Sequence, residues 1–136
     1  MFRNLTRLIT TTLVVGSLTA GATAQPKADD EEIFSRLLTV AVGNEIREKC
    51  PTIEARTIAA TLYFLGILNY ARSIGFTKDQ MFAYRDDPKN QESLRKATYA
   101  YLDKHGVNRA VPASYCILGT AEIAQNSETG KLLKRR

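Results

Sequence analysis

The sequence predicts an all-α fold, a single-domain bundle of about five helices with one disulfide between helices. Apolar residues recur at helical spacing through most of the chain, and no stretch shows the sustained alternation of a strand. Prolines and glycines divide the chain into segments of helix length. The chain also holds two cysteines, Cys50 and Cys116, whose chemistry depends on the compartment in which the protein works.

Residues 1–24 have the features of a secretory signal peptide. Two arginines give a positive start, and residues 8–18 form a short apolar stretch diluted by threonines. A small-x-small pattern then ends at Ala24, so we expect cleavage between Ala24 and Gln25 and an exported mature chain. An uncleaved anchor helix is the alternative, but the apolar stretch is shorter than the ~20 residues that a span requires.

Behind the cleavage site, residues 25–32 are predicted to form a flexible acidic linker, and residues 33–136 a helical domain with a basic C-terminal tail. Loss of two arginines with the signal peptide leaves 17 basic and 14 acidic side chains, a net charge of +3. Four of the basic side chains form the tail: Lys131, Lys134, Arg135 and Arg136. Without the tail the count is 13 against 14, so the domain has no basic face and nucleic acid is not an expected partner. The tail is expected either to touch anionic surfaces such as lipid or glycan, or to be a solvated, frayed end.

The first helix is expected to begin at Asp29 or Asp30, since either side chain can cap a helix. Glu31 and Glu32 then suit the positive end of its dipole. The helix ends before Pro51, because a residue that precedes proline disfavours helical geometry.

The second helix is expected from about Ile53 to Ile74, with Gly75 as its stop. Its middle is apolar on nearly every side, which predicts a helix buried by neighbours all round. A membrane span is the alternative, and it is excluded because Arg56 and Arg72 bracket only fifteen residues.

A third, short helix is predicted to about Tyr84 by the most specific local signal in the chain. Thr77 and Gln80 have the spacing of a capping box, and Phe76 and Met81 have that of a hydrophobic staple.

A proline marks the start of both the fourth and the fifth predicted helix. Asp87 and Pro88 suit the cap and first positions of a helix that stops at Gly106. Pro112 begins the next, and a short basic helix is expected after Gly130. Asp87 and its acidic neighbours do not match the spacing of a calcium loop, so we expect a cap-and-turn role for them.

Cys50 and Cys116 are 66 residues apart, which excludes a C-x-x-C redox motif. Two cysteines and a single distant histidine do not make a zinc site unless carboxylates are recruited. A nucleophilic cysteine needs a histidine, and His105 is expected to sit at a helix C-terminus, where its cation is favourable. A disulfide formed after export therefore remains, and it ties the first helix to the fifth.

Tyrosines and one acidic residue supply the other candidates for a site. The tyrosines of the predicted helices have two interpretations. Their rings either pack in the core or line a groove that binds a ligand. Glu122 stands among small and apolar residues, so it is expected to be partly buried. One alternative is that it pairs with Arg47, Arg56 or Arg72. The other is that it is an acid of raised pKa. The candidate ligand or partner surface comprises Tyr63, Tyr70, Arg72, Tyr99, Tyr101, Tyr115 and Glu122.

Four segments together resemble a known family: EIREKCP, LNYARSIGFTKDQ, YLDKHGV and SYCILGTAEIAQNSETGKLL. The chain is similar, from about Ile33 to Leu133, to a family of exported alphaproteobacterial proteins classed only as a domain of unknown function. The pairing of C-P after the first helix with Y-C-x-L-G-x-x-E-I is the most specific part. The resemblance implies a signal peptide, a helical fold, a two-cysteine bridge and a periplasmic location, and it transfers no catalytic residue.

These observations favour a non-enzymatic periplasmic binding or interaction module, either an adaptor or a stress-chaperone-like protein. Its expected partner is an envelope protein or a small ligand, and no cofactor or metal is expected. A small-ligand-binding protein with a pocket among the tyrosines is one alternative, and an envelope hydrolase or hydrolase inhibitor is the other. The sequence has no serine-hydrolase, zinc-protease, phosphate-loop or paired-carboxylate motif, so no enzymatic activity is expected.

Overall fold

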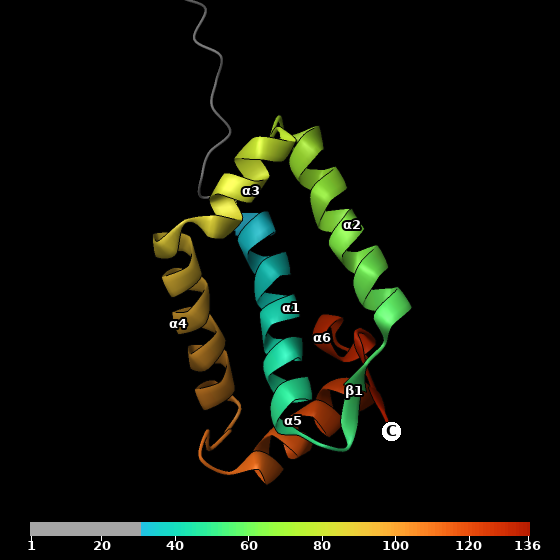
Figure 1. The fold of residues 1–136 in the computed structure, drawn as a ribbon. Helices are drawn as coiled ribbons and strands as arrows, with labels where there is room; N and C mark the ends of the chain where they lie inside the picture. The colour runs from blue at the N-terminus through green and yellow to red at the C-terminus, as the bar shows by residue number, and fades with distance from the viewer. Residues whose placement is uncertain (1–30) are drawn as a thin grey trace, which may run out of the picture.

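The computed structural model describes residues 31–136, which form six helices and one two-stranded antiparallel sheet (Figure 1). The elements in chain order are α1 (Glu31–Lys49), β1 (Ile53–Ala55), α2 (Thr57–Ser73), α3 (Lys78–Asp86), α4 (Pro88–Lys104), α5 (Pro112–Ala124), α6 (Glu128–Lys131) and β2 (Leu133–Arg135). The predicted helical bundle with its inter-helix disulfide is confirmed. The predicted signal peptide, its cleavage site and residues 25–30 of the predicted linker lie outside the described residues, and the rest of that linker belongs to α1.

Helix α1 is the centre of the bundle (Figure 1). It lies between α4 and α2, while α5 crosses its C-terminal end and α3 joins the far end of α2 to the start of α4. The main core draws its buried side chains from α1, α4, α5, both strands, the turn after α1 and the loop after α4. They are Val42, Ile46, Cys50, Ile53, Leu102, Val107, Tyr115, Leu118 and Leu133.

The predicted starts of α3 and α4 and the predicted end of α4 are confirmed by their capping residues. Thr77 Oγ1 accepts a hydrogen bond from the Gln80 N–H, and the Gln80 side chain accepts one from the Thr77 N–H, which completes the capping box. Asp87 caps α4 by accepting from the N–H groups of Lys89 and Asn90. His105 is the C-cap of α4, and Gly106 follows it with a φ of 75°.

The two strands were not predicted, and they correct the expected start of the second helix. Ile53 pairs with Arg135 and Ala55 pairs with Leu133, so residues 53–55 are strand and α2 starts only at Thr57. The side chain of Ile53 packs in the main core, and its backbone pairs with Arg135. This segment is therefore extended rather than helical. Apolar residues at a helix start and in a short buried strand look alike in sequence.

The expectation of a frayed basic tail was wrong. Residues 133–135 form β2, and the Arg136 N–H donates to the Thr52 carbonyl at 3.0 Å. Lys134 lies 3.0 Å from a carboxylate oxygen of Glu54 on the neighbouring strand. The short terminal helix ends at Lys131 and starts before Gly130 rather than after it.

Helix α2 corrects a second prediction, that neighbours bury it all round. Only Ile67 and Ala71 of its seventeen residues are buried. The cause is the position of α1, which packs against α4 and α5 on its other sides and meets α2 along a single stripe (Figure 1). Within the described part of the chain, nothing covers the opposite side of α2.

Candidate functional site

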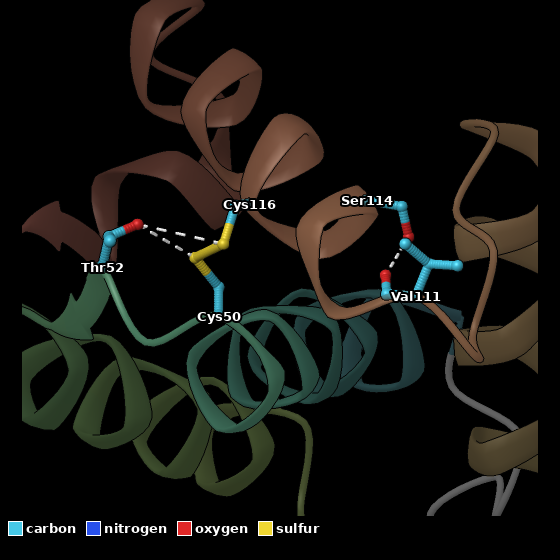
Figure 2. The surroundings of a disulfide bond; sticks show 5 residues. All are labelled: Cys50, Thr52, Val111, Ser114 and Cys116. Atoms are coloured by element: carbon cyan, nitrogen blue, oxygen red, sulfur yellow. Dashed lines mark hydrogen bonds between the residues drawn. A yellow bond between two sulfur atoms is a disulfide. The ribbon is translucent and has the colours of Figure 1, made fainter.

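The disulfide Cys50–Cys116 holds the end of α1 against the first turns of α5, with the two Cα atoms 5.0 Å apart (Figure 2). Thr52 lies on the turn after Cys50, and its hydroxyl is 3.2 Å from Sγ of Cys50 and 3.8 Å from Sγ of Cys116. Ser114 bonds the Val111 carbonyl at 2.7 Å at the start of the same helix. Both cysteines are therefore structural, and the predicted bridge is confirmed.

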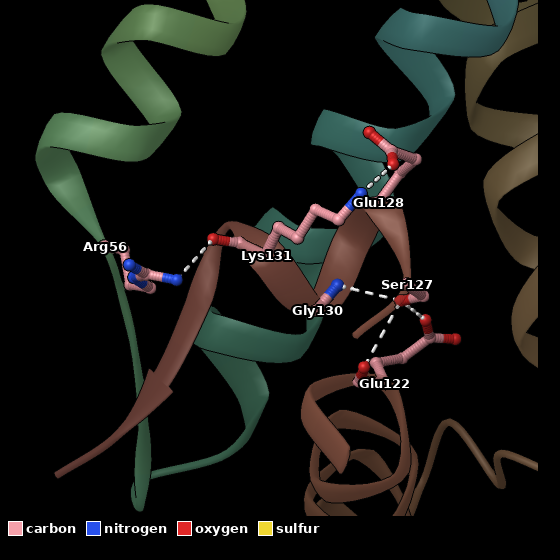
Figure 3. A network of polar contacts seen from close by, with 6 residues as sticks. All are labelled: Arg56, Glu122, Ser127, Glu128, Gly130 and Lys131. Atoms are coloured by element: carbon pink, nitrogen blue, oxygen red, sulfur yellow. Dashed lines mark hydrogen bonds and ion pairs between the residues drawn. The ribbon is translucent and has the colours of Figure 1, made fainter. Parts of the chain in front are cut away.

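Glu122 is the most buried charged side chain among residues 31–136, at 4% exposure. The Tyr101 hydroxyl donates to Glu122 Oε1 at 2.5 Å, and the Ser127 hydroxyl donates to Oε2. Ser127 in turn accepts from the Gly130 N–H at 2.9 Å, so the carboxylate fastens α6 to α5 (Figure 3). Gly130 lies so close that an added Cβ would be 2.0 Å from the Glu122 carbonyl oxygen.

Glu122 was expected to be partly buried and to pair with an arginine; it is buried, but its side-chain partners are the hydroxyl groups of Tyr101 and Ser127. Arg47 bonds Asn44 at 2.6 Å, and Arg56 donates to the Lys131 carbonyl (Figure 3). Two neutral donors satisfy the carboxylate without a second buried charge. Burial raises the pKa of the Tyr101 phenol, and its hydrogen bond to Glu122 adds to this.

The candidate tyrosines fall into two separate groups. Tyr99, Tyr101 and Tyr115 pack in or against the main core, whereas Tyr63 and Tyr70 pack with α1 and α2. Burial raises the pKa of Tyr115, and the charge of Glu45 adds to this. None of the five lines the cavity between α1, α2 and α3.

An apolar cavity of about 200 Å³ lies between α1, α2 and α3. Its charged side chains are Arg72 from α2 and Lys78 and Arg85 from α3. Arg72 is thus the one member of the predicted surface that lines this cavity. Its apolar side chains are Ile33, Leu37, Phe64, Ile67, Leu68, Phe76, Met81, Phe82 and Tyr84.

The second candidate is a surface rather than a cavity. Ile58, Leu62 and Leu65 are 78%, 63% and 46% exposed and lie at i, i+4 and i+7 on α2. This spacing puts them on one side of the helix. We call these three residues the α2 outer face, because they point away from the buried Ile67 and Ala71.

An open hollow of about 570 Å³ adjoins the α2 outer face. Ile58 and Leu62 line it together with Arg56 and with Lys134 from β2. The basic tail therefore places one cation, Lys134, beside an apolar surface. The alternative of a solvated, frayed end did not predict this contact.

The site has the composition of a binding surface. Among residues 31–136, no three His, Cys, Asp or Glu side chains lie close enough to hold a metal ion. No helix in this range is both long and apolar enough to cross a membrane. Both candidate sites combine apolar side chains with arginine and lysine, which suits the binding of apolar partners with negative groups.

Sequence reasoning missed the α2 outer face because it assigned the whole helix to the core. One signal was available in the sequence. Arg56 and Arg72 flank the helix, and Thr61 and Asn69 continue the exposed side between them. A helix with polar residues on only one side has that side in water, and three large aliphatic residues share it here.

Comparison with known proteins identifies the family. No curated protein and no solved structure matches the chain. A family model does match residues 25–134, which is nearly the whole of the predicted mature chain. The chain belongs to the family of unknown function DUF5333.

Proposed function

We propose that this protein is a non-enzymatic, exported interaction module that binds another protein of the cell envelope through the α2 outer face. One observation carries the proposal: Ile58, Leu62 and Leu65 form an aliphatic stripe on a helix that nothing in residues 31–136 covers. Exposed aliphatic side chains that lie side by side, rather than scattered singly, are typical of an interaction site. A single stripe at helical spacing suits one partner helix or groove, and so favours an adaptor over a general chaperone.

The charges beside the α2 outer face indicate which kind of protein surface it binds. Helix α2 contains no aspartate or glutamate, Arg56 precedes it, and Lys134 stands beside Ile58 and Leu62. Glu54 neutralises part of this charge, since it lies 3.0 Å from Lys134, but it does not line the hollow. The complementary surface is therefore an apolar strip of a protein with carboxylates along its border. Burial of the three aliphatic side chains supplies the affinity, and the cations set the orientation.

Export and a periplasmic location belong to the same proposal. The disulfide supports them, because such bonds persist in oxidising compartments. The family match begins at Gln25, the first residue after the predicted cleavage site.

Cross-linking and co-purification in the native host test the proposal. The full chain, tagged behind a flexible C-terminal linker, is compared with L62E and with I117E as the matched control. Ile117 is 73% exposed on α5 and lies outside the α2 outer face. We expect one stoichiometric protein partner with the wild-type chain and I117E, and its loss with L62E. Equal recovery with L62E and the wild type would overturn the proposal.

A further inference from the structure

The apolar cavity on the inner side of α2 supports an inference beyond protein docking. Three helices build its wall, with Ile33 and Leu37 from α1, Ile67 and Leu68 from α2, and Met81 from α3. Its volume of about 200 Å³ exceeds the ~150 Å³ of an apolar cavity that accepts benzene. It is smaller than the roughly 300–1,000 Å³ of sites for drug-sized molecules, so it has room for one small apolar group such as a single acyl chain.

The charged side chains that line this cavity are all of one sign. Among residues 31–136 they are Arg72, Lys78 and Arg85, and all three are exposed. Asp86 neutralises part of this charge, since it lies 2.7 Å from Nε of Arg85, but it does not line the cavity. The carboxylate of Asp79 is likewise on α3 and outside the lining. The mouth therefore favours an anionic group.

Phe82 links the cations to the apolar wall. Its ring is 43% exposed and lines the cavity. Nζ of Lys78 lies 5.6 Å from the ring centre, and Cζ of Arg85 lies 5.0 Å from it. Both cations thus stand where apolar surface meets water, which is the position of a head group on an apolar chain.

We propose that the apolar cavity binds a single acyl chain that ends in a carboxylate. The chain lies among the α1, α2 and α3 side chains, and the carboxylate faces Arg72, Lys78 and Arg85. A neutral head group gains nothing from these cations, and a cationic one is repelled by them. Ile58, Leu62 and Leu65 do not line this cavity, so the site does not depend on the proposed protein partner.

Isothermal titration calorimetry of the purified protein tests the proposal with three probes that share a chain of ten carbons, each at a concentration too low for aggregation. They are decanoate, decanol and decyltrimethylammonium. We expect saturable binding of one decanoate per chain, at least fivefold tighter than either other probe at low salt. The preference should shrink as salt rises, because exposed charges are screened. Equal affinity for all three probes, or no saturable binding of decanoate, would overturn the proposal.

Matched charge variants locate the head group. R72Q/K78Q removes two of the three cations, while K49Q/K104Q removes two lysines from the last turns of α1 and α4. We expect R72Q/K78Q to weaken decanoate binding about fivefold and leave decanol binding unchanged, and K49Q/K104Q to change neither. Unchanged decanoate binding in R72Q/K78Q would contradict the assignment.

A tryptophan variant locates the chain independently of charge. The protein contains no tryptophan, so F82W gives a fluorescence signal from this cavity alone. We expect its emission to shift to shorter wavelength as decanoate binds, with the same saturation point as the calorimetric titration. Saturable binding without a change in this emission would place the ligand elsewhere and reject the cavity.

Discussion

The phenol of Tyr101 on α4 and the carboxylate of Glu122 on α5 share a hydrogen bond of 2.5 Å. Glu122 also accepts from Ser127, which begins α6. One buried carboxylate therefore joins three helices, and the last of them leads directly into β2 beside the α2 outer face. The network and the disulfide together fix the end of the bundle from which α2 projects.

Removal of the Tyr101 hydroxyl tests this network. We expect Y101F to lower the free energy of unfolding by about 1–3 kcal/mol, because a buried charged acceptor loses one of its two donors. Y63F is the control, since Tyr63 packs in the other cluster, and it should change stability by less than about 0.5 kcal/mol. Urea unfolding of both variants measures the difference. Equal effects would mean that the hydroxyl does not stabilise Glu122.

Alkaline titration reports on the same hydrogen bond. The pKa of Tyr101 is raised in the folded protein, so above its ordinary value of about 10 the unfolded chain loses this proton first. The unfolded state then binds fewer protons than the folded state, and stability falls as pH rises. Tyr101 contributes up to about 1.4 kcal/mol per pH unit to this loss. Unfolding at pH 8 to 11 should give a shallower decline in Y101F than in the wild type. Parallel curves would refute the assignment.

Loss of the disulfide should have the largest effect on stability. The bond closes a separation of 66 residues, for which the chain-entropy model gives roughly 4 kcal/mol. We expect C50S/C116S to lose stability of that order in urea unfolding. T52V keeps the bond and removes the nearby hydroxyl, and should cost less than about 1 kcal/mol. A C50S/C116S protein as stable as T52V would show that the bridge contributes little.

Two glycines give opposite predictions for the same substitution. G130A places a Cβ against the Glu122 carbonyl oxygen and should destabilise the protein by about 1–3 kcal/mol or more. G66A on α2 meets no atom within 4 Å and should stabilise the protein by about 0.5–1 kcal/mol. Melting temperatures that shift in opposite directions confirm both placements, whereas a harmless G130A would contradict the close contact of α6 with α5.

Local signals in the sequence predicted most of the fold. The Thr77–Gln80 capping box, the Asp87 cap and the proline starts of α4 and α5 depend on a few neighbouring residues, so they could be recognised without the rest of the chain. The disulfide was predicted from the expected export and from the exclusion of other cysteine chemistry, and the structure contains it.

The predictions that were wrong concern features that depend on packing between distant segments. The pairing of Ile53 with Arg135 joins segments that are far apart in the sequence, and no local pattern predicts it. The partners of Glu122 depend on how α4 and α6 approach α5. The exposure of Leu62 depends on which sides of α1 are already occupied, and apolar content alone predicted burial.

Site-specific photo-cross-linking in living cells tests the central claim most directly. A photoreactive phenylalanine analogue is placed at Leu65 on the α2 outer face, and in a second strain at Ile117 on α5 as an apolar control that is still more exposed. The account predicts one discrete protein adduct from position 65 and none from position 117. The purified adduct partner should bind the wild-type chain with salt-sensitive affinity, and bind neither L62E nor a chain with Arg56 and Lys134 changed to glutamate. Cross-links to the same chain, to lipid, or equally from both positions would contradict the account.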